Sequence, residues 1–277
     1  MPGLGDGLLS VDSQPAQRCR ATSRAVGVLH SILLDRHGFR HGFSTRAGGV
    51  SAAPFDSLNL GFHLGDDDEA VRENRARFAR SLDLSLDHLF EQRQVHGNQV
   101  REVTRSDRTA HVVNLEGDAL VAREEGLGVA ARTADCVPIL IAHPPSGDVA
   151  AVHAGWRGAV ANVTGHAVQQ MKHDPTEMIA AIGPHIRVRA FEIGDEVASE
   201  MERAACGRPV AARGNVKAHG DLAALIRLQL QDRGIPPTAI DDVGGCTHDD
   251  AGLFFSHRRD HGRTGRHLSV IVARPPR

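Results

Sequence analysis

The chain has 277 residues, of which 41% are hydrophobic and 24% are charged, and its formal net charge is −2. A chain of this length buries roughly three-quarters of its unfolded surface, so it needs no disulfide or structural metal to hold a core. The balance of 32 basic and 34 acidic residues argues against a nucleic-acid binder, because phosphate neutralisation needs a clear basic excess. The apolar run Val137–Ala142 is far shorter than the ~18 residues of a membrane helix, which excludes a membrane protein.

The cysteines and the N-terminal segment indicate the compartment and the domain organisation. Cys19, Cys136, Cys206 and Cys246 form no C-x-x-C pair and are too sparse for a disulfide framework, which favours a reducing, cytoplasmic environment. Residues 1–25 show little periodicity and no apolar run after a basic segment, so we expect a disordered tail rather than a secretory signal. Residues 26–277 contain no repeat or long linker and are expected to form one domain.

From Val26 onward, predicted strands and helices alternate, which indicates a mixed α/β (α+β) domain. The acidic segment 65–69 opens a helix in which Val71, Phe78 and Leu82 recur at helical spacing. The later predicted elements are strands over Leu127–Ala131, Val137–Ala142 and Val149–His153, a helix over Ala159–Met171, a strand over Met178–Ile182, a helix over Ile193–Ala205, a helix capped by Asp221 and closed by Gly234, and strands over Ile240–Val243 and Leu268–Val272.

Polar residues collect where the apolar strands stop, and three of them are metal-ligand types. His96, Cys136 and His153 each lie beside a glycine or another small residue. Two imidazoles and a thiolate suit Zn²⁺, and three protein ligands leave a fourth position open, as in catalytic zinc sites. Their spacing matches no local zinc motif, so spacing alone favours a buried cysteine and two hydrogen-bonded histidines.

Other catalytic motifs are absent from the sequence. It contains no H-E-x-x-H, no P-C-x-x-C, no G-x-S-x-G and no G-x-x-x-x-G-K-[ST] segment. A nucleophile pair of Cys136 and His153 is an alternative use of the same residues. Five arginines could bind phosphate, although in a chain this rich in Arg any single one is more often a surface residue; they are Arg46, Arg157, Arg258, Arg259 and Arg266.

A series of longer blocks carries a resemblance to a known family. In order, the blocks are His41-Gly-Phe-Ser-Thr-Arg-Ala-Gly-Gly-Val-Ser, Ser57-Leu-Asn-Leu-Gly, Glu73-Asn-Arg, Gln94-Val-His-Gly, Thr133-Ala-Asp-Cys-Val-Pro-Ile-Leu, His153-Ala-Gly-Trp-Arg-Gly, Ile182-Gly-Pro, Glu192-Ile-Gly-Asp-Glu-Val, Cys246-Thr, Phe254-Phe-Ser-His-Arg-Arg-Asp and Gly265-Arg. From about residue 26 to 272 the chain closely resembles the YfiH/laccase-domain family, once called polyphenol oxidases.

The resemblance implies a fold and a chemistry. The expected fold is one of layered mixed β-sheets flanked by helices. The expected activity is phosphorolysis of adenosine, inosine and methylthioadenosine, together with deamination of adenosine. The implied metal ligands are again His96, Cys136 and His153, holding Zn²⁺ or, alternatively, Cu²⁺. Bound Zn²⁺ would lower the pKa of a water molecule towards ~7 and so supply a nucleophile for deamination.

The matched blocks also supply further candidate residues. Asp135 and Asp118 are candidate proton carriers in deamination. Candidate substrate-binding residues are Arg46, Asn59, Cys246, Arg258 and Arg259. The expected small-molecule partners are purine nucleosides and phosphate, and the sequence leaves the oligomeric state open.

Two positions depart from the family pattern, and two other functions compete with it. His185 stands where the family commonly has Cys, and His257 stands where many members have Tyr, so the preferred nucleoside stays open. A copper-dependent phenol oxidase would need several clustered copper sites, and the chain has no H-x-H pair. A non-catalytic metal-bound interaction module would need a fourth protein ligand that closes the site.

Overall fold

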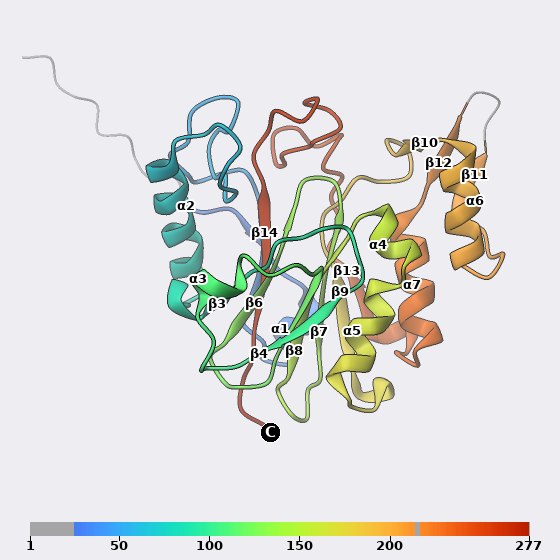
Figure 1. Cartoon of the computed structure of the whole chain (residues 1–277), viewed down its shortest axis with the longest axis horizontal. Helices are drawn as coiled ribbons and strands as arrows, with labels where there is room; N and C mark the ends of the chain where they lie inside the picture. Colours follow the sequence, from blue (N-terminus) through green and yellow to red (C-terminus); the bar gives the residue numbers. More distant parts are fainter. Residues whose placement is uncertain (1–24, 214–216, 277) are drawn as a thin grey trace, which may run out of the picture.

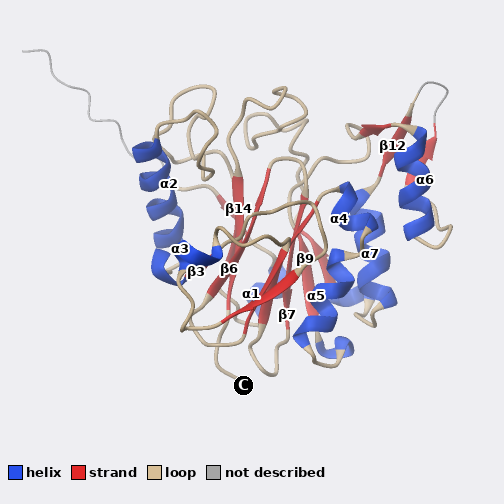
Figure 2. Cartoon of the chain, viewed as in Figure 1, coloured by secondary structure: helices blue, strands red, loops and turns tan. Residues whose placement is uncertain are grey.

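The computed structural model describes residues 25–213 and 217–276 (Figure 1). The predicted N-terminal tail therefore lies outside the described residues, apart from Ala25. The expected single α/β domain of layered mixed sheets flanked by helices is confirmed (Figures 1 and 2).

A six-stranded sheet forms the centre of the molecule. Its strand order is β13-β9-β7-β8-β5-β4, and all neighbours are antiparallel except the pairs β13·β9 and β4·β5. The strands are β4 (Val100–Val103), β5 (Ala119–Ala122), β7 (Val137–Ala142), β8 (Val149–Ala154), β9 (Ile179–Ile182) and β13 (Ile240–Asp242).

Two smaller sheets complete the β-structure. The five-stranded sheet has the order β1-β2-β14-β6-β3, with β1 (Val28–Leu29), β2 (His41–Ser44), β14 (His267–Val272), β6 (Gly128–Thr133) and β3 (Leu89–Phe90). The last strand of the chain, β14, lies in the middle of this sheet, antiparallel to both β2 and β6. A small antiparallel sheet has the order β10-β12-β11, with β10 (Glu192–Ile193), β12 (Ala218–Gly220) and β11 (Ala211–Arg213).

The alternation of side chains along β7 shows how the layers are held. Leu140 joins the apolar core that lies between the six-stranded and five-stranded sheets, where it is packed with residues such as Val129 and Ile271. Ile139 and Ile141 point to the opposite face and join the core beneath the helices. Because both faces of β7 are covered, the strand is an unbroken apolar run, as buried strands usually are.

Helices cover the outer faces of the two large sheets. One group lies over the six-stranded sheet and comprises α4 (Trp156–Val160), α5 (Val163–Met171) and α7 (Leu222–Asp232), with α6 (Asp195–Ala204) beside the small sheet. On the other side, Phe78 of α2 (Asp68–Ser81) and Leu82, which follows the helix, share a core with Leu268 and Val270 of β14. Figure 2 shows α2 and the α5–α7 group on opposite sides of the strands.

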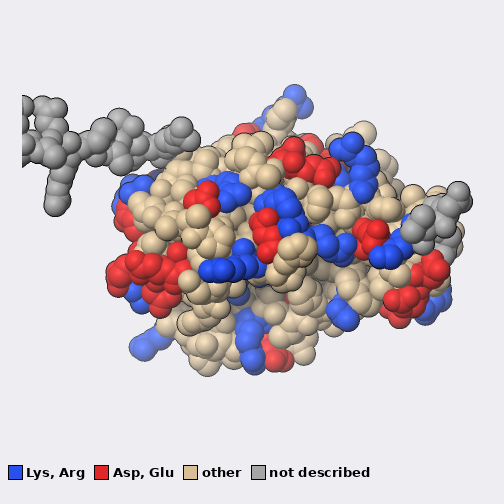
Figure 3. All heavy atoms as spheres, turned by 90° about the horizontal axis from the view of Figure 1, so that it is seen from above, with Lys and Arg blue, Asp and Glu red and all other residues tan. Residues whose placement is uncertain are grey.

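Short elements connect these layers. They are α1 (Ile32–Arg36), α3 (Thr109–Val112) and the 3₁₀ turns η1 (Leu86–His88), η2 (Pro175–Glu177) and η3 (Pro237–Ala239). No helix in residues 25–213 or 217–276 combines the length and apolar character that crossing a membrane requires. Figure 3 shows basic and acidic side chains interspersed over the face that lies at the top of Figure 1.

The prediction over Ala159–Met171 needs correction, because the structure has two helices there. Asn162 has the left-handed backbone (φ 58°), and its side chain accepts a hydrogen bond from the amide of Gly165, so it ends the α4 segment and caps α5. Asn tolerates this conformation better than most residues, which explains the break. The prediction over Val137–Ala142 matches β7 residue for residue, whereas β2, β5 and the small sheet were not predicted.

His267 on β14 makes the stability of the fold depend on pH. The ring is 4% exposed, and its Nε2 accepts a hydrogen bond from the amide of Phe255 at 2.8 Å. Burial lowers the pKa of His267 from 6.5 to about 3, and the charge of Arg46 adds to this effect. Between these values the unfolded chain binds a proton that the folded chain does not, so stability falls as the pH falls through this window.

We expect His267→Gln to remove this component of the pH dependence. Between pH 5.5 and about 4, where the unfolded chain is protonated at this residue and the folded chain is not, the wild type should lose up to about 1.4 kcal/mol more unfolding free energy per pH unit than the variant. Urea unfolding at several pH values measures the difference. The exposed His261, replaced by Gln, serves as the control and should keep the wild-type slope. Equal slopes in the wild type and His267→Gln would contradict this prediction.

Candidate metal centre and pocket

Three residues from different segments of the chain converge at one point. One ligand atom from each of His96, Cys136 and His153 lies within 4.8 Å of the others. His96 comes from the loop before β4, Cys136 directly precedes β7, and His153 lies on β8. The register of β7 and β8 pairs Val137 with Ala154, which brings Cys136 and His153 together. The three positions selected from the sequence therefore form one cluster.

Gly155 allows this cluster to be as tight as it is. A Cβ atom at this position would lie 2.4 Å from Nδ1 of His96 and 3.1 Å from Sγ of Cys136. Real Cβ atoms do not approach other atoms at the shorter of these distances, so a side chain here would displace His96. The glycine that follows β8 is therefore part of the cradle that holds the ligand atoms together.

The buried carboxylate of Asp118 orients two of the three residues. It accepts hydrogen bonds from the amides of Val95, His96 and Gly97 at 3.2, 3.0 and 2.7 Å. Its Oδ1 also lies 2.8 Å from Nδ1 of His153, so Nδ1 donates and Nε2 is left for the cluster. A carboxylate behind a histidine is the usual arrangement at metal sites, where it fixes the ring and raises its basicity.

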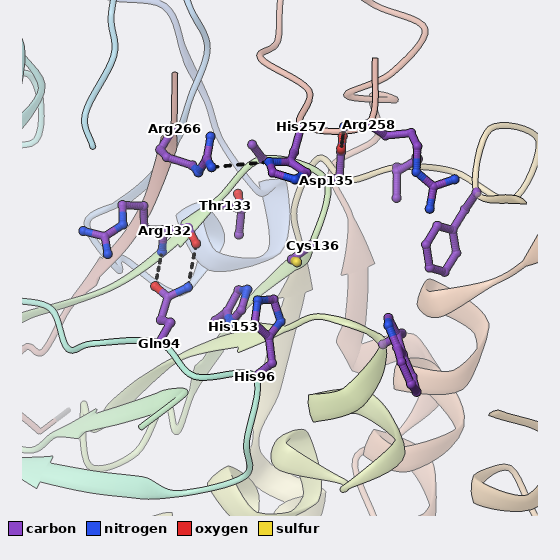
Figure 4. Close-up of a pocket in the computed structure, with 14 residues that line it drawn as sticks. Gln94, His96, Arg132, Thr133, Asp135, Cys136, His153, His257, Arg258 and Arg266 are labelled. Atoms are coloured by element: carbon purple, nitrogen blue, oxygen red, sulfur yellow. Dashed lines mark hydrogen bonds between the residues drawn. The ribbon is translucent and has the colours of Figure 1, made fainter. Parts of the chain in front are cut away.

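The side chain of Gln94 holds the loop of His96 against β6. Its Nε2 donates to the carbonyl of Arg132 at 2.7 Å, and its Oε1 accepts from the amide of Arg132 at 2.8 Å (Figure 4). The parallel ladder between β3 and β6 ends at Phe90 and Val129. Gln94 therefore continues that pairing with its side-chain amide beyond the end of the ladder, close to both His96 and Cys136.

The charges within the cluster favour a thiolate. Burial opposes ionisation of Cys136, but the charge of His153 and hydrogen bonds from His153 and His96 outweigh it and lower the pKa of the thiol to about 6. Burial likewise opposes protonation of His153, but Cys136 and Asp118 outweigh it and raise the pKa of the imidazole to about 9. A thiolate with two imidazoles is a donor set that fits a transition-metal ion, which would take the place of the shared proton.

A cavity of about 400 Å³ opens above the cluster, which is the size of a small-molecule site (Figure 4). His96, Cys136 and His153 all line it. Trp156, Ile186 and Phe191 supply apolar wall, and the remaining lining residues are Gln94, Arg132, Thr133, Ala134, Asp135, His257, Arg258 and Arg266. The cavity therefore combines a candidate metal centre and an apolar wall with three arginines in its lining.

The three arginines are held in different ways. Arg266 donates from Nη1 to the carbonyls of Thr264 and Gly265, and its Nη2 is directed towards His257. Arg258 donates to the carbonyl of Glu192 and lies over the ring of Phe191, 5.4 Å from its centroid. These two groups border the cavity from its upper edge in Figure 4.

Arg132 is directed elsewhere. Its side chain runs away from the cluster in Figure 4, and its Nη1 lies 3.6 Å from Oε2 of the buried Glu91. Glu91 also forms an ion pair with Arg75, so Arg132 belongs to a charged group behind the cavity wall.

The two candidate proton carriers occupy structural positions. Asp118 does not line the cavity. Asp135 does, but its Oδ1 accepts from Oγ1 of Thr247 and its Oδ2 from the amide of Arg258, both at 2.6 Å. It also has a left-handed backbone, with φ 91°. Asp135 therefore fixes the loop of Arg258 to the turn that carries Cys136.

Four candidate substrate-binding residues lie outside the lining of the cavity, and their side chains or amides brace the surrounding loops. Arg46 donates to the carbonyls of Asp56 and Ala251. Asn59 accepts from the amide of Arg266 and thereby supports that lining residue. The two others are Arg259, which donates to the carbonyls of Thr247, His248 and Phe254, and Cys246, whose amide donates to Asp250.

The two departures from the family pattern differ in position. His185 is 1% exposed, and burial and the charge of Arg187 lower its pKa to about 4. It donates to the carbonyl of Gly183 and does not line the cavity, so it adds no imidazole to the site. His257 does line the cavity and lies beside Arg266.

Sequence reasoning missed several lining residues. Arg132 is four residues before Cys136, and Trp156 follows Gly155 in the block that carries His153, so proximity to the ligands was an available signal for both. No such signal was available for Phe191, because it is not close in sequence to His96, Cys136 or His153. The fold of the chain between β9 and β10 brings it to the cavity.

Comparison with known proteins finds a matching family and several similar proteins. The sequence model of the family described as "Multi-copper polyphenol oxidoreductase laccase" matches residues 40–274. A purine nucleoside phosphorylase of Deinococcus radiodurans is 39% identical over 234 residues, covering 83% of this chain and 88% of that protein. A purine nucleoside phosphorylase of Mycobacterium tuberculosis is 41% identical over 232 residues, covering 82% of this chain and 89% of that protein.

Solved structures agree with this assignment. The crystal structure of YlmD from Geobacillus stearothermophilus superimposes with a TM-score of 0.84 at 34% identity, covering 92% of this chain and 98% of that chain. The YfiH protein of Bacillus licheniformis gives a TM-score of 0.78 at 30% identity, covering 84% and 92%. The resemblance in the sequence blocks is thereby confirmed, and the chain belongs to the laccase-like YfiH family, whose relatives here carry the name purine nucleoside phosphorylase.

Proposed function

We propose that the protein is a zinc-dependent purine nucleoside phosphorylase that cleaves adenosine, inosine and methylthioadenosine to the free base and ribose 1-phosphate, with adenosine deaminase activity. The observation that carries the proposal is the cavity itself, which brings together guanidinium groups, a His-Cys-His cluster and an apolar wall. The names of the relatives support the phosphorylase activity. The three free cysteines of the described chain support a cytoplasmic protein.

His96, Cys136 and His153 would hold the metal, with Asp118 behind His153. Bound Zn²⁺ supplies Lewis acidity to an oxygen atom placed in the cavity. Zinc is favoured because thiolate and imidazole are both zinc ligands and three protein ligands leave a position open for water or substrate.

Different residues of the cavity would bind different parts of the substrates. Arg258 and Arg266 are the cations on the cavity edge and would bind phosphate, since guanidinium groups pair with phosphate oxygens. Trp156 and Phe191 are the aromatic residues of the cavity wall against which a purine can pack; Arg157 and Arg258 each cover one face of these rings. The ribose would then lie between these two regions, above the cluster.

Proton transfer in the deamination has less support from the geometry. Both oxygens of Asp135 already accept short hydrogen bonds, and Asp118 lies outside the cavity lining. Each carboxylate is therefore better suited to holding the site than to carrying a proton, and phosphorolysis is the activity on which the proposal principally rests.

The two alternative functions have weaker support. The described residues contain one other group with metal-ligand spacing, His30, Asp35 and His41, but both ring nitrogens of the buried His41 already bind backbone groups. A multicopper oxidase needs several copper sites, and this second group is not free to supply one. An interaction module with a closed metal would need a fourth ligand, and the cluster within the described chain has three.

Incubation of zinc-loaded protein with adenosine, with and without phosphate, tests the proposed function. Chromatography should show adenine and ribose 1-phosphate when phosphate is present, and slow formation of inosine when it is absent. Cys136→Ala, prepared identically, should be inactive and controls for contaminating host enzymes. Equal turnover by both proteins would refute the proposal, and oxygen consumption with phenols by copper-loaded wild type alone would favour the oxidase.

We predict one zinc per chain in the wild type and its loss from Cys136→Ala and His153→Ala. Each change leaves two protein ligands, which is too few to retain the metal against dialysis. Elemental analysis after dialysis measures the metal content. Cys206→Ala is a suitable control, because Cys206 is exposed and remote from the cluster. Full zinc occupancy in both ligand variants would exclude this set of ligands.

We predict that Asp118→Asn weakens metal binding without abolishing it. The amide cannot accept from the three backbone amides and from His153 as the carboxylate does, so both histidines lose their orientation. Loss of such a partner typically lowers metal affinity about 10–100-fold. Competition with a chelator measures the affinity, and an affinity equal to that of the wild type would show that Asp118 does not support the site.

We predict that Arg266→Gln and Arg258→Gln raise the KM for phosphate, whereas Arg259→Gln lowers thermal stability instead. The first two line the cavity, and Arg259 braces carbonyls of the surrounding loop. Initial rates at varied phosphate give the KM values, with the exposed Arg80 on α2 replaced by Gln as the control. A similar small change at all four positions would contradict the assignment of the phosphate subsite.

A further inference from the structure

The polar groups that line the cavity are largely engaged with the protein. The side-chain amide of Gln94 is hydrogen-bonded to the backbone of Arg132, and the carboxylate of Asp135 accepts hydrogen bonds from Thr247 and Arg258. Apart from the arginines and the cluster, four lining side chains keep an N–H or O–H without a partner among the described residues: Thr133, Trp156, His257 and Gln94, whose Nε2 uses only one of its two N–H groups. These four side chains are candidates for a group that acts on the substrate beyond the metal and the phosphate.

His257 differs from the other three because the guanidinium of Arg266 lies next to its ring. Nη2 of Arg266 is 3.5 Å from Nδ1 of His257 (Figure 4). A guanidinium only donates hydrogen bonds, so Nδ1 must accept, and the ring proton is on Nε2. Donation by a cation to one ring nitrogen polarises the ring and strengthens the N–H on the other side as a donor.

The position of His257 suits the bond that breaks in phosphorolysis. In sequence it adjoins Arg258, which lies against the aromatic wall at Phe191, and in space it contacts Arg266. His257 thus lies between a candidate phosphate-binding residue and the surface on which the base would stack. Figure 4 shows its ring at the cavity edge above Cys136.

We propose that Nε2–H of His257 donates a hydrogen bond to N7 of the departing purine, which makes His257 a catalytic residue; this role rests on the phosphorylase function proposed above. As the C1′–N9 bond breaks, its electron pair passes to the purine ring, and negative charge grows on the ring nitrogens. A donor directed at that charge binds the transition state more strongly than the ground state and so accelerates the step.

The reaction balances without a net proton from His257. With HPO₄²⁻ as the co-substrate, a C1′–O bond to phosphate forms as the C1′–N9 bond breaks. The proton of HPO₄²⁻ ends on the purine, which leaves as the neutral base, and ribose 1-phosphate leaves as the dianion. His257 keeps its Nε2 proton throughout and only stabilises the charge that builds up in between.

Two substrates separate this role from a structural one. In inosine N7 can accept a hydrogen bond, whereas in 7-methylinosine N7 carries a methyl group and a positive charge and cannot accept one. At saturating phosphate, His257→Phe in the zinc-loaded protein should lower kcat for inosine about 10²-fold and leave kcat for 7-methylinosine nearly unchanged. His257→Gln keeps an N–H near the position of Nε2 and should recover part of the rate on inosine.

The controls use the same loop and the same preparation. His261 is exposed and does not line the cavity, so His261→Gln should match the wild type on both substrates. Cys136→Ala supplies the background from host enzymes. If His257→Phe does not fold, His257→Gln decides through the kcat for inosine divided by the kcat for 7-methylinosine. A quotient below that of the wild type supports the role, and an unchanged quotient contradicts it.

The remaining outcomes each have one meaning. Equal losses on both substrates would show that His257 acts on phosphate or on the shape of the cavity, which overturns the proposal. No loss on either substrate overturns it as well. If folded, metal-loaded wild type cleaves neither nucleoside, the phosphorylase function itself fails, and the role of His257 fails with it.

Discussion

The candidate site depends above all on one buried charge, the carboxylate of Asp118. Burial raises the pKa of this group, but hydrogen bonds from His153 and from the amide of Gly97 outweigh that effect, and the net shift is downward. The charge is therefore kept inside the protein because three amides and an imidazole solvate it in place of water. The same hydrogen bonds fix the loop of His96 to β8. The groups that solvate Asp118 therefore also set the geometry of the cluster.

The layered sheets explain why this arrangement can be rigid. Cys136 directly precedes β7 and His153 lies on β8. These two strands pair with each other and are buried on both faces. Any movement of one relative to the other would break a ladder inside the core. His96 has no strand of its own, and it is held instead by Asp118 and by the side-chain pairing of Gln94 with β6. The cluster thus combines two positions fixed by a sheet with one fixed by side chains.

Sequence reasoning succeeded where one signal dominated. The apolar run of β7 predicted that strand fully, and the three candidate ligands, each in a distinctive block, lie together in the structure. Sequence reasoning was less successful around the cavity, because the same blocks contain both residues that line the cavity and residues that support its loops. Arg258 lines the cavity, while its neighbour Arg259 binds loop carbonyls, and nothing local in the sequence distinguishes them. Likewise, the break at Asn162 depends on a backbone conformation that hydrophobic spacing does not report.

The central place of β14 has a consequence for the order in which this protein can form during synthesis. The cluster residues all lie between positions 96 and 153, but the five-stranded sheet cannot close until residues 267–272 insert between β2 and β6. The strand contributes Val270 and Ile271 to the two cores on either side of that sheet, so both cores stay incomplete until this strand has been synthesised. The residues of the candidate metal cluster are therefore synthesised well before the strand that closes the five-stranded sheet, and they must wait for that strand before the layers around them are complete.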